Sequence, residues 1–127
     1  MVKVEQLMKQ NLVSVEAGTL VVDAAKLMKS HNVGSVFVCQ KGSIVGIVTE
    51  SDVVKKFLGG EKVPYFIPVE QIMSSPVLGI EADRPVTEAA DLMNMHRTRH
   101  LAVTKSGMFI GIVSVRDFLK PVAVDEL

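Results

Sequence analysis

Residues 46–52 read Gly-Ile-Val-Thr-Glu-Ser-Asp, and residues 111–117 read Gly-Ile-Val-Ser-Val-Arg-Asp. The two stretches lie 65 positions apart, and the same shift aligns residues 4–56 with residues 69–121 without a gap. Nineteen of these 53 aligned positions are identical, which is far more than chance matching gives. The chain therefore contains an internal duplication, and both copies are expected to share one local structure.

Each copy has the pattern of a mixed α and β unit. Short runs of β-branched and aromatic residues predict strands, and apolar residues at helical spacing predict helices. In the first copy, helices are predicted at residues 4–9, 21–31 and 50–58, and strands at residues 12–15, 36–39 and 44–48. Residues 40–43 are predicted to form the turn between the last two strands. Apart from the leading helix at 4–9, this order is βαββα, and it occurs twice. The chain is therefore predicted to have an α+β fold.

The two copies are expected to form one domain over residues 1–127. A unit of about 60 residues buries too little apolar surface to be comfortably stable alone. The repeats, at residues 4–58 and 69–121, are therefore expected to pack sheet against sheet with pseudo-two-fold symmetry. The segment between them, residues 59–68, contains two glycines and two prolines and is predicted to be a linker.

Composition excludes several classes of protein. Lys plus Arg and Asp plus Glu are both 14 in 127 residues, and this zero net charge argues against a nucleic-acid partner. Apolar runs such as Ile44–Val48 are too short to cross a membrane. A single cysteine, Cys39, forms no internal disulfide and predicts a cytoplasmic location. No metal-ligand spacing and no nucleophile–base set is present, so neither a metal site nor an enzyme is predicted.

Three motifs recur in order in both copies. They are Leu-Met or Ile-Met at 7–8 and 72–73, an acid followed by Ala-Ala at 23–25 and 88–90, and the Gly-to-Asp stretches quoted above. With these motifs the repeats resemble the CBS domain, the cystathionine-β-synthase-type motif, which occurs in tandem pairs called Bateman modules. The resemblance implies a regulatory protein that binds AMP, ADP, ATP or S-adenosylmethionine in clefts between two repeats. It implies no required cofactor.

The hydroxyl and acid of each Gly-to-Asp stretch have two interpretations. Thr49 with Asp52, and Ser114 with Asp117, are spaced as capping boxes at helix starts. A carboxylate also offers two acceptor oxygens to the paired hydroxyls of a ribose, and the resemblance favours that role. The two roles are compatible, since a capping hydroxyl can also donate to a ligand.

Basic residues are concentrated in the second copy. Arg97, Arg99, His100 and Arg116 are candidates for binding phosphate, because a guanidinium matches phosphate oxygens. The alternative is a solvated helix end that favours cations. The first copy lacks these arginines, and its nearest cations are Lys55 and Lys56. One of the two clefts is therefore expected to bind a phosphorylated nucleotide better than the other.

The resemblance implies an adenine slot in the first and second strands of the repeats. In this sequence its residues are Val13, Ser14, Val77, Leu78, Val38 and Val103. Phe37 and Ala102 stand where many relatives have proline, and Gly79 replaces a small polar or β-branched residue. Gly46 and Gly111, inside predicted strands, indicate either close packing of the sheet on a helix or close approach of a ligand.

Apolar positions outside the strands give two further expectations. Five methionines at helical spacing, Met8, Met28, Met73, Met93 and Met95, are expected to fill the core. The closing helices, around Val53-Val54-Phe57 and Phe118-Leu119, are candidates for the seam of a homodimer, which the resemblance also implies. Too few residues flank the repeats for an effector domain, so regulation is expected in trans, on an unidentified effector protein, or by self-association. The competing function is a ligand-free interaction scaffold.

Overall fold

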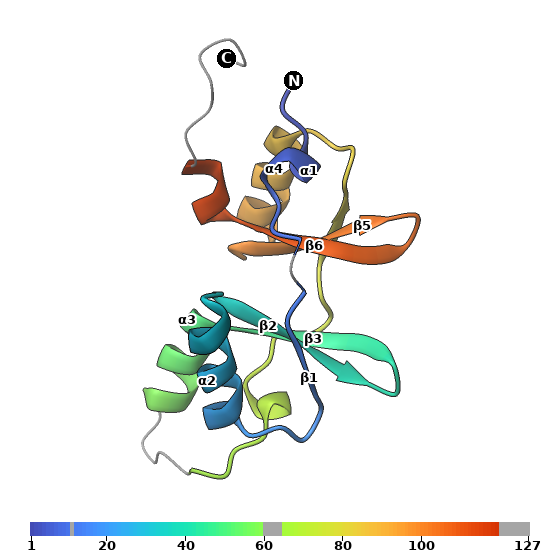
Figure 1. Ribbon diagram of the computed structural model, residues 1–127. Coiled ribbons are helices and arrows are strands. Elements are labelled where there is room, and N and C mark those ends of the chain that lie inside the picture. The colour runs from blue at the N-terminus through green and yellow to red at the C-terminus, as the bar shows by residue number, and fades with distance from the viewer. Residues whose placement is uncertain (11, 60–64, 120–127) are drawn as a thin grey trace. The chain divides into compact units, whose positions relative to one another are not determined.

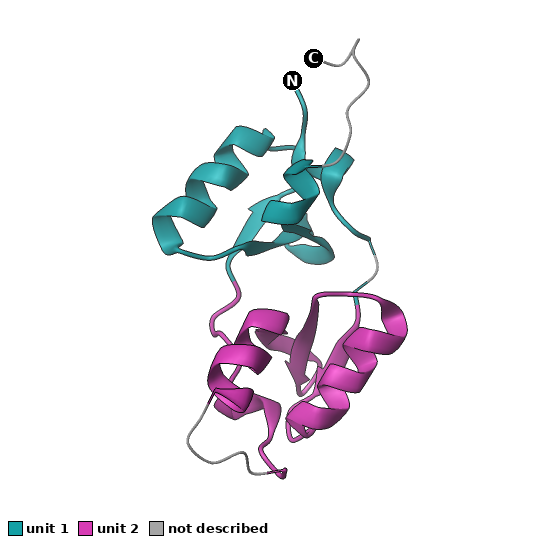
Figure 2. Ribbon diagram, turned by 90° about the vertical axis from the view of Figure 1, so that its left-hand side faces the viewer, with its two compact units in different colours: residues 1–12, 78–127 teal, residues 13–77 magenta. Residues whose placement is uncertain are grey.

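The computed structural model describes residues 1–10, 12–59 and 65–119. The chain divides into two compact units, shown in Figure 2: unit 1 joins Met1–Leu12 to the chain from Leu78 onward, and unit 2 is Val13–Val77. Each unit contains one three-stranded sheet. Residues 60–64 of the predicted linker, and residues 120–121 of the predicted second repeat, lie outside the described residues.

Unit 2 contains the elements of the first repeat from β1 onward and the start of the second repeat. Its elements are β1 (Ser14–Glu16), α2 (Val21–His31), β2 (Ser35–Gln40), β3 (Ser43–Thr49), α3 (Glu50–Asp52), the π-helical η1 (Val53–Leu58) and the 3₁₀ turn η2 (Val69–Gln71). β1 runs parallel to β2, and β2 runs antiparallel to β3. Helix α2 connects the parallel strands and, with η1, packs its apolar side chains on one face of the sheet (Figure 1).

Unit 1 repeats this arrangement. Its elements are α1 (Val4–Leu7), β4 (Gly79–Glu81), α4 (Val86–His96), β5 (His100–Lys105), β6 (Met108–Ser114) and the 3₁₀ helix η3 (Val115–Leu119). β4 is parallel to β5, and β5 is antiparallel to β6, with the same bulge position as in unit 2. The predicted α+β fold of two βαββα repeats is confirmed.

Both long helices end on a residue in the left-handed conformation. Asn32 ends α2 with φ 52°, and Arg97 ends α4 with φ 53°. In each case the cap amide donates back to carbonyls of the last turn, so the helix stops there and the chain turns into the central strand. These caps fix residues 32 and 97 beside the start of β2 and of β5.

The core of each unit includes a segment from the other sequence repeat. Val69 and Ile72, from the start of the second repeat, are buried in the unit 2 core. Val4, from the start of the first repeat, is buried in the unit 1 core. Short antiparallel bridges hold these segments, Ile47 with Ser74 and Lys9 with Ile112. The compact units and the sequence repeats therefore do not coincide.

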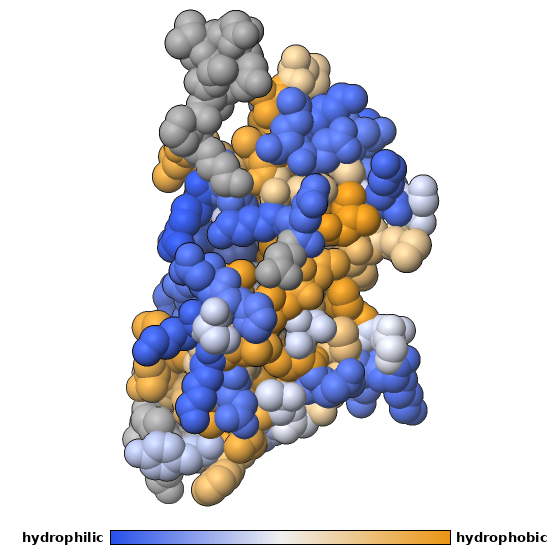
Figure 3. Space-filling view, in the orientation of Figure 1, coloured by the Kyte–Doolittle hydropathy of each residue, from blue (hydrophilic) through white to orange (hydrophobic). Residues whose placement is uncertain are grey.

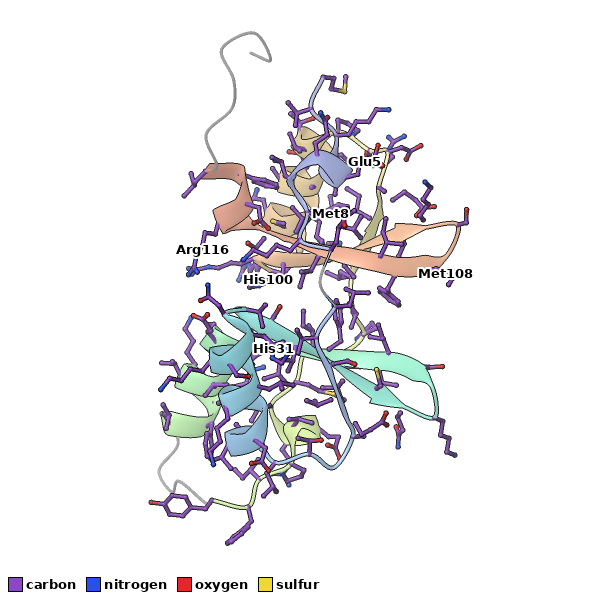
Figure 4. All side chains as sticks on the ribbon, in the orientation of Figure 1. Glu5, Met8, His31, His100, Met108 and Arg116 are labelled. Carbon is purple, nitrogen blue, oxygen red and sulfur yellow. The ribbon has the colours of Figure 1, made fainter. Side chains whose placement is uncertain are left out.

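Close packing by these segments accounts for the two strand glycines. A Cβ on Gly111 would lie 2.7 Å from the carbonyl oxygen of Lys9 and 2.8 Å from Sδ of Met8. A Cβ on Gly46 would collide with Sδ of Met73. Figure 4 shows Met8 beside β6. Of the two interpretations of these glycines, the structure supports close packing, and the neighbour is the crossing segment.

Two expectations about apolar residues are wrong. Met28 and Met93 are buried, and Met8 and Met73 pack against the cores, but Met95 is 71% exposed. Met95 lies two residues after Met93 in α4, so its side chain points away from the buried face of that helix. Phe57, expected in a dimer seam, is buried in the core of unit 2.

Candidate functional site

The turn from Thr49 to Asp52 is a reciprocal capping box. The backbone amide of Asp52 donates to Oγ1 of Thr49 over 3.1 Å, and the amide of Thr49 donates to Oδ2 of Asp52 over 3.0 Å. The capping interpretation is confirmed for this turn. Only 8% of Asp52 is exposed, so β3 and α3 hold its carboxylate in a fixed, largely dry position.

A lysine neutralises the Asp52 carboxylate. Nζ of Lys56 lies 3.0 Å from Oδ1 of Asp52, and it also donates to the carbonyl oxygen of Ile72 over 3.1 Å. Because the lysine side chain is about half exposed, the pair contributes at most about 1 kcal/mol to stability. Both oxygens of Asp52 therefore have a partner, and a ligand at Oδ1 must share it with Lys56 or displace it.

The corresponding turn in unit 1 differs in its hydrogen bonds. Oδ2 of Asp117 accepts from the backbone amide of Ser114 over 2.8 Å and from the Ser114 hydroxyl over 3.2 Å. The hydroxyl thus donates to the acid, whereas Thr49 accepts from a backbone amide. Asp117 is only 2% exposed. Ser114 and Asp117 are adjacent as predicted, and the Asp117 carboxylate accepts from both the amide and the hydroxyl of Ser114.

Substitution of Thr49 with alanine is expected to lower the free energy of unfolding by about 1 kcal/mol, because it removes the acceptor for the Asp52 amide. Urea denaturation measures this difference. Thr49→Ser keeps the hydroxyl and is the matched control, expected to lose less than half as much. Equal losses in the two variants would contradict the capping role.

The predicted basic cluster lies at one end of the β5–β6 hairpin. His100 pairs with Ser114 across the sheet, and the carbonyl oxygen of Arg99 accepts from the amide of Val115 over 3.0 Å. Arg97 caps α4 three residues before His100, and Figure 4 shows Arg116 and His100 at the hairpin end opposite Met108. Figure 3 shows hydrophilic surface at this end.

The arginines of this cluster carry uncompensated charge. Arg97, Arg99 and Arg116 are exposed, and none pairs with an acidic side chain within the part of the chain that the structure describes. A cluster of this kind attracts anions, and the planar guanidinium suits phosphate. Arg97 also lies at the negative end of the α4 dipole, so the helix-end interpretation applies to it as well.

The adenine-slot candidates are divided between the units. Val13, Ser14, Val38 and Val77 belong to unit 2, and Leu78 and Val103 belong to unit 1. The carbonyl oxygens of Val13 and Leu78 accept from the next strand, from Phe37 and Ala102, each over 2.9 Å. Val38 and Val103 lie in the central strands and are fully buried in the two cores.

Residues beyond the predicted set also shape these strand ends. Sequence reasoning named Lys56 as a nearby cation without assigning it to Asp52, although their i, i+4 spacing was a usable signal. It gave no role to Glu50, which lines a groove between α2 and the helical segment after β3. The other walls of this groove include Met28, Lys29 and Val54.

The described ranges contain neither a metal-binding cluster nor a membrane-spanning helix. No group of three or more His, Cys, Asp or Glu side chains there is arranged to hold a metal ion. No helix in the same ranges is long and apolar enough for a membrane span. Cys39 is half-buried and lies across the sheet from Glu16 and Ile44.

Known proteins share both the sequence and the fold of this chain. An uncharacterized 17.7 kDa protein of Acidianus ambivalens is 38% identical over 120 residues, which cover 93% of this chain and 71% of that protein. The chain spans only 32% and 62% of two other archaeal relatives, from Methanocaldococcus jannaschii and Methanopyrus kandleri.

Solved structures match over nearly the whole chain. A CBS-domain protein from Burkholderia ambifaria is 33% identical with a TM-score of 0.87, covering 99% of this chain and 97% of that one. A CBS domain pair in complex with 5′-methylthioadenosine and S-adenosyl-L-methionine has a TM-score of 0.79 and 93% coverage of both chains, and at 23% identity it shares the fold alone. The CBS domain family itself matches residues 4–59 and 69–124, so this chain belongs to that family and contains a tandem pair of CBS domains.

Proposed function

We propose that this CBS pair is a regulatory module that binds an adenosyl ligand, with AMP, ADP, ATP and S-adenosylmethionine as candidates. Asp52 and Asp117 accept hydrogen bonds from ribose hydroxyls, and the arginine cluster receives phosphate. The CBS pair solved with 5′-methylthioadenosine and S-adenosylmethionine supports this ligand class. Binding acts by favouring one arrangement of the protein, which an effector in trans or a second copy then recognises.

The observation that carries the proposal is the arginine cluster beside Asp117. Three exposed arginines without an acidic partner among the described residues lie at chain positions next to the strand end that holds a buried carboxylate. A structural role alone does not require such a concentration of like charge, which weakens the folded state by repulsion. A ligand that carries both a diol and a phosphate binds the carboxylate with its diol and the arginines with its phosphate.

Titration with adenosyl compounds is expected to stabilise the protein. At 100 times its dissociation constant, a bound ligand raises the free energy of unfolding by about 2.7 kcal/mol. Thermal unfolding with adenosine, AMP, ADP, ATP and S-adenosylmethionine measures this effect. Asp117→Asn keeps an acceptor for Ser114 but removes the charge, and it is expected to weaken binding at least about tenfold, since hydrogen bonds to charged groups contribute about 1.5–3 kcal/mol. Asp83→Asn, in an exposed turn of unit 1, is the control.

The second candidate function is a ligand-free scaffold that forms a homodimer. It is favoured by exposed apolar side chains that follow the last strand of each repeat: Val54 is 59% exposed, Leu58 57% and Leu119 80%. Figure 3 shows apolar surface over η1. A dimer by light scattering, together with no thermal response to any compound in the panel, would favour this function over ligand binding.

A further inference from the structure

The end of the β2–β3 hairpin and the end of the β5–β6 hairpin share a backbone hydrogen bond, but the side chains at the two ends carry opposite charge. The amide of Glu50 donates to the carbonyl oxygen of Gly34 over 3.0 Å, as the amide of Val115 donates to Arg99. Under the 65-residue shift Gly34 corresponds to Arg99, and Glu50 corresponds to Val115. A carboxylate in one repeat thus lies where the other repeat has an apolar side chain flanked by arginines.

The glycine makes room for this carboxylate. A Cβ on Gly34 would lie 3.0 Å from Oε1 of Glu50, so the glutamate side chain folds back over the entrance of β2. Glu50 is exposed and has no ion-pair partner in residues 1–10, 12–59 and 65–119; Lys29 lines the same groove but lies beyond ion-pair distance. Lys56 pairs with Asp52, whereas the Glu50 carboxylate has no cation within ion-pair distance in the same ranges.

We propose that Glu50 is a specificity-determining residue, which makes the Thr49–Asp52 end of the pair select an adenosyl ligand without phosphate. This inference rests on the proposed function. A ribose held at Asp52 directs its 5′ substituent into the field of Glu50, and that field repels phosphate while tolerating a neutral or cationic group. Phosphate-bearing ligands then bind at the Ser114–Asp117 end, where Val115 carries no charge and Arg99 and Arg116 do.

The size of the effect follows from Coulomb repulsion at a protein surface. Like charges near a protein surface, partly screened by water and salt, change an affinity by about threefold to tenfold. Adenosine and ATP differ in phosphate and share the base and the ribose. Their relative affinity at one strand end therefore isolates this charge from every other contact.

The test removes the carboxylate from the Asp52 end and introduces one at the Asp117 end. Backbone amide shifts of Asp52 and Asp117 report binding at each end separately during titrations with adenosine and with ATP. Glu50→Gln is expected to tighten ATP at the Asp52 end by about threefold to tenfold and to leave adenosine within about twofold. Val115→Glu is expected to weaken ATP by a similar factor at the Asp117 end. Val115→Gln, which adds a side chain of the same size without charge, is the matched control.

The possible outcomes separate this inference from the proposed function. If the unmodified protein binds both compounds but Glu50→Gln leaves the ratio of ATP to adenosine affinity unchanged at the Asp52 end, the role of Glu50 is wrong and the function stands. The same holds if Val115→Gln weakens ATP as much as Val115→Glu does. If neither compound shifts the amides at either end, the proposed function fails, and the inference fails with it.

Discussion

Substitution of Gly111 with alanine is expected to lower the free energy of unfolding by about 2 kcal/mol, which is within the range measured for overpacked cores. The new methyl group would meet the carbonyl oxygen of Lys9 at 2.7 Å. Lys9 has no freedom to move aside, because its amide and its carbonyl both bond to Ile112, over 2.8 and 2.9 Å. Relief of the clash therefore breaks the bridge between the leading segment and β6.

Gly46→Ala is the matched control, because it adds the same methyl group at the corresponding position. Its nearest neighbour is the thioether of Met73, the far end of a flexible side chain, and the closest backbone oxygen, of Ser74, is 3.1 Å away. We expect a loss of about 1 kcal/mol or less, because methionine adapts readily to a changed cavity. Urea denaturation of both variants measures the difference. A loss for Gly46→Ala equal to or above that for Gly111→Ala would contradict this account.

The repeat architecture could be predicted because its signals are local. Runs of β-branched and aromatic residues and the helical spacing of apolar residues depend on a few neighbouring residues, and the duplication supplies each signal twice. The exchange of leading segments could not be predicted this way. Residues 4–6 and 69–71 are both Val-Glu-Gln, so the sequence contains nothing that assigns either segment to one sheet rather than the other.

The candidate site shows the same division between local and distant information. The Thr49–Asp52 cap follows from a spacing of three residues and was predictable. The position of Glu50 depends on the missing side chain of Gly34, sixteen residues earlier and just before β2, and no periodicity signals it. Phe57 was assigned to a dimer seam as an apolar residue of the closing helix, but it packs in the core of unit 2.

Substitution of Val4 with aspartate is expected to open the core of the second repeat, although Val4 lies at the start of the first. The side chain is fully buried in a cluster with Leu101, Val103 and Val113, and no cation lies in that cluster to pair with a carboxylate. An unpaired charge in an apolar core costs about 3 kcal/mol or more. This expected loss exceeds those of Thr49→Ala and Gly111→Ala.

Amide hydrogen exchange distinguishes which repeat is affected. In Val4→Asp, protection is expected to fall at Leu101, Val103 and Val113 and to persist at Val36, Val38 and Val48, because the latter belong to the other core. Val69→Asp is the mirror variant, and it should reverse this pattern, since Val69 is fully buried in unit 2. Glu5→Asp, on the exposed side of α1, should change neither set. If Val4→Asp instead lowered protection chiefly in β2 and β3, the leading segments would belong to their own repeats. The destabilisation would then follow the order of the sequence, and the exchange described above would be wrong.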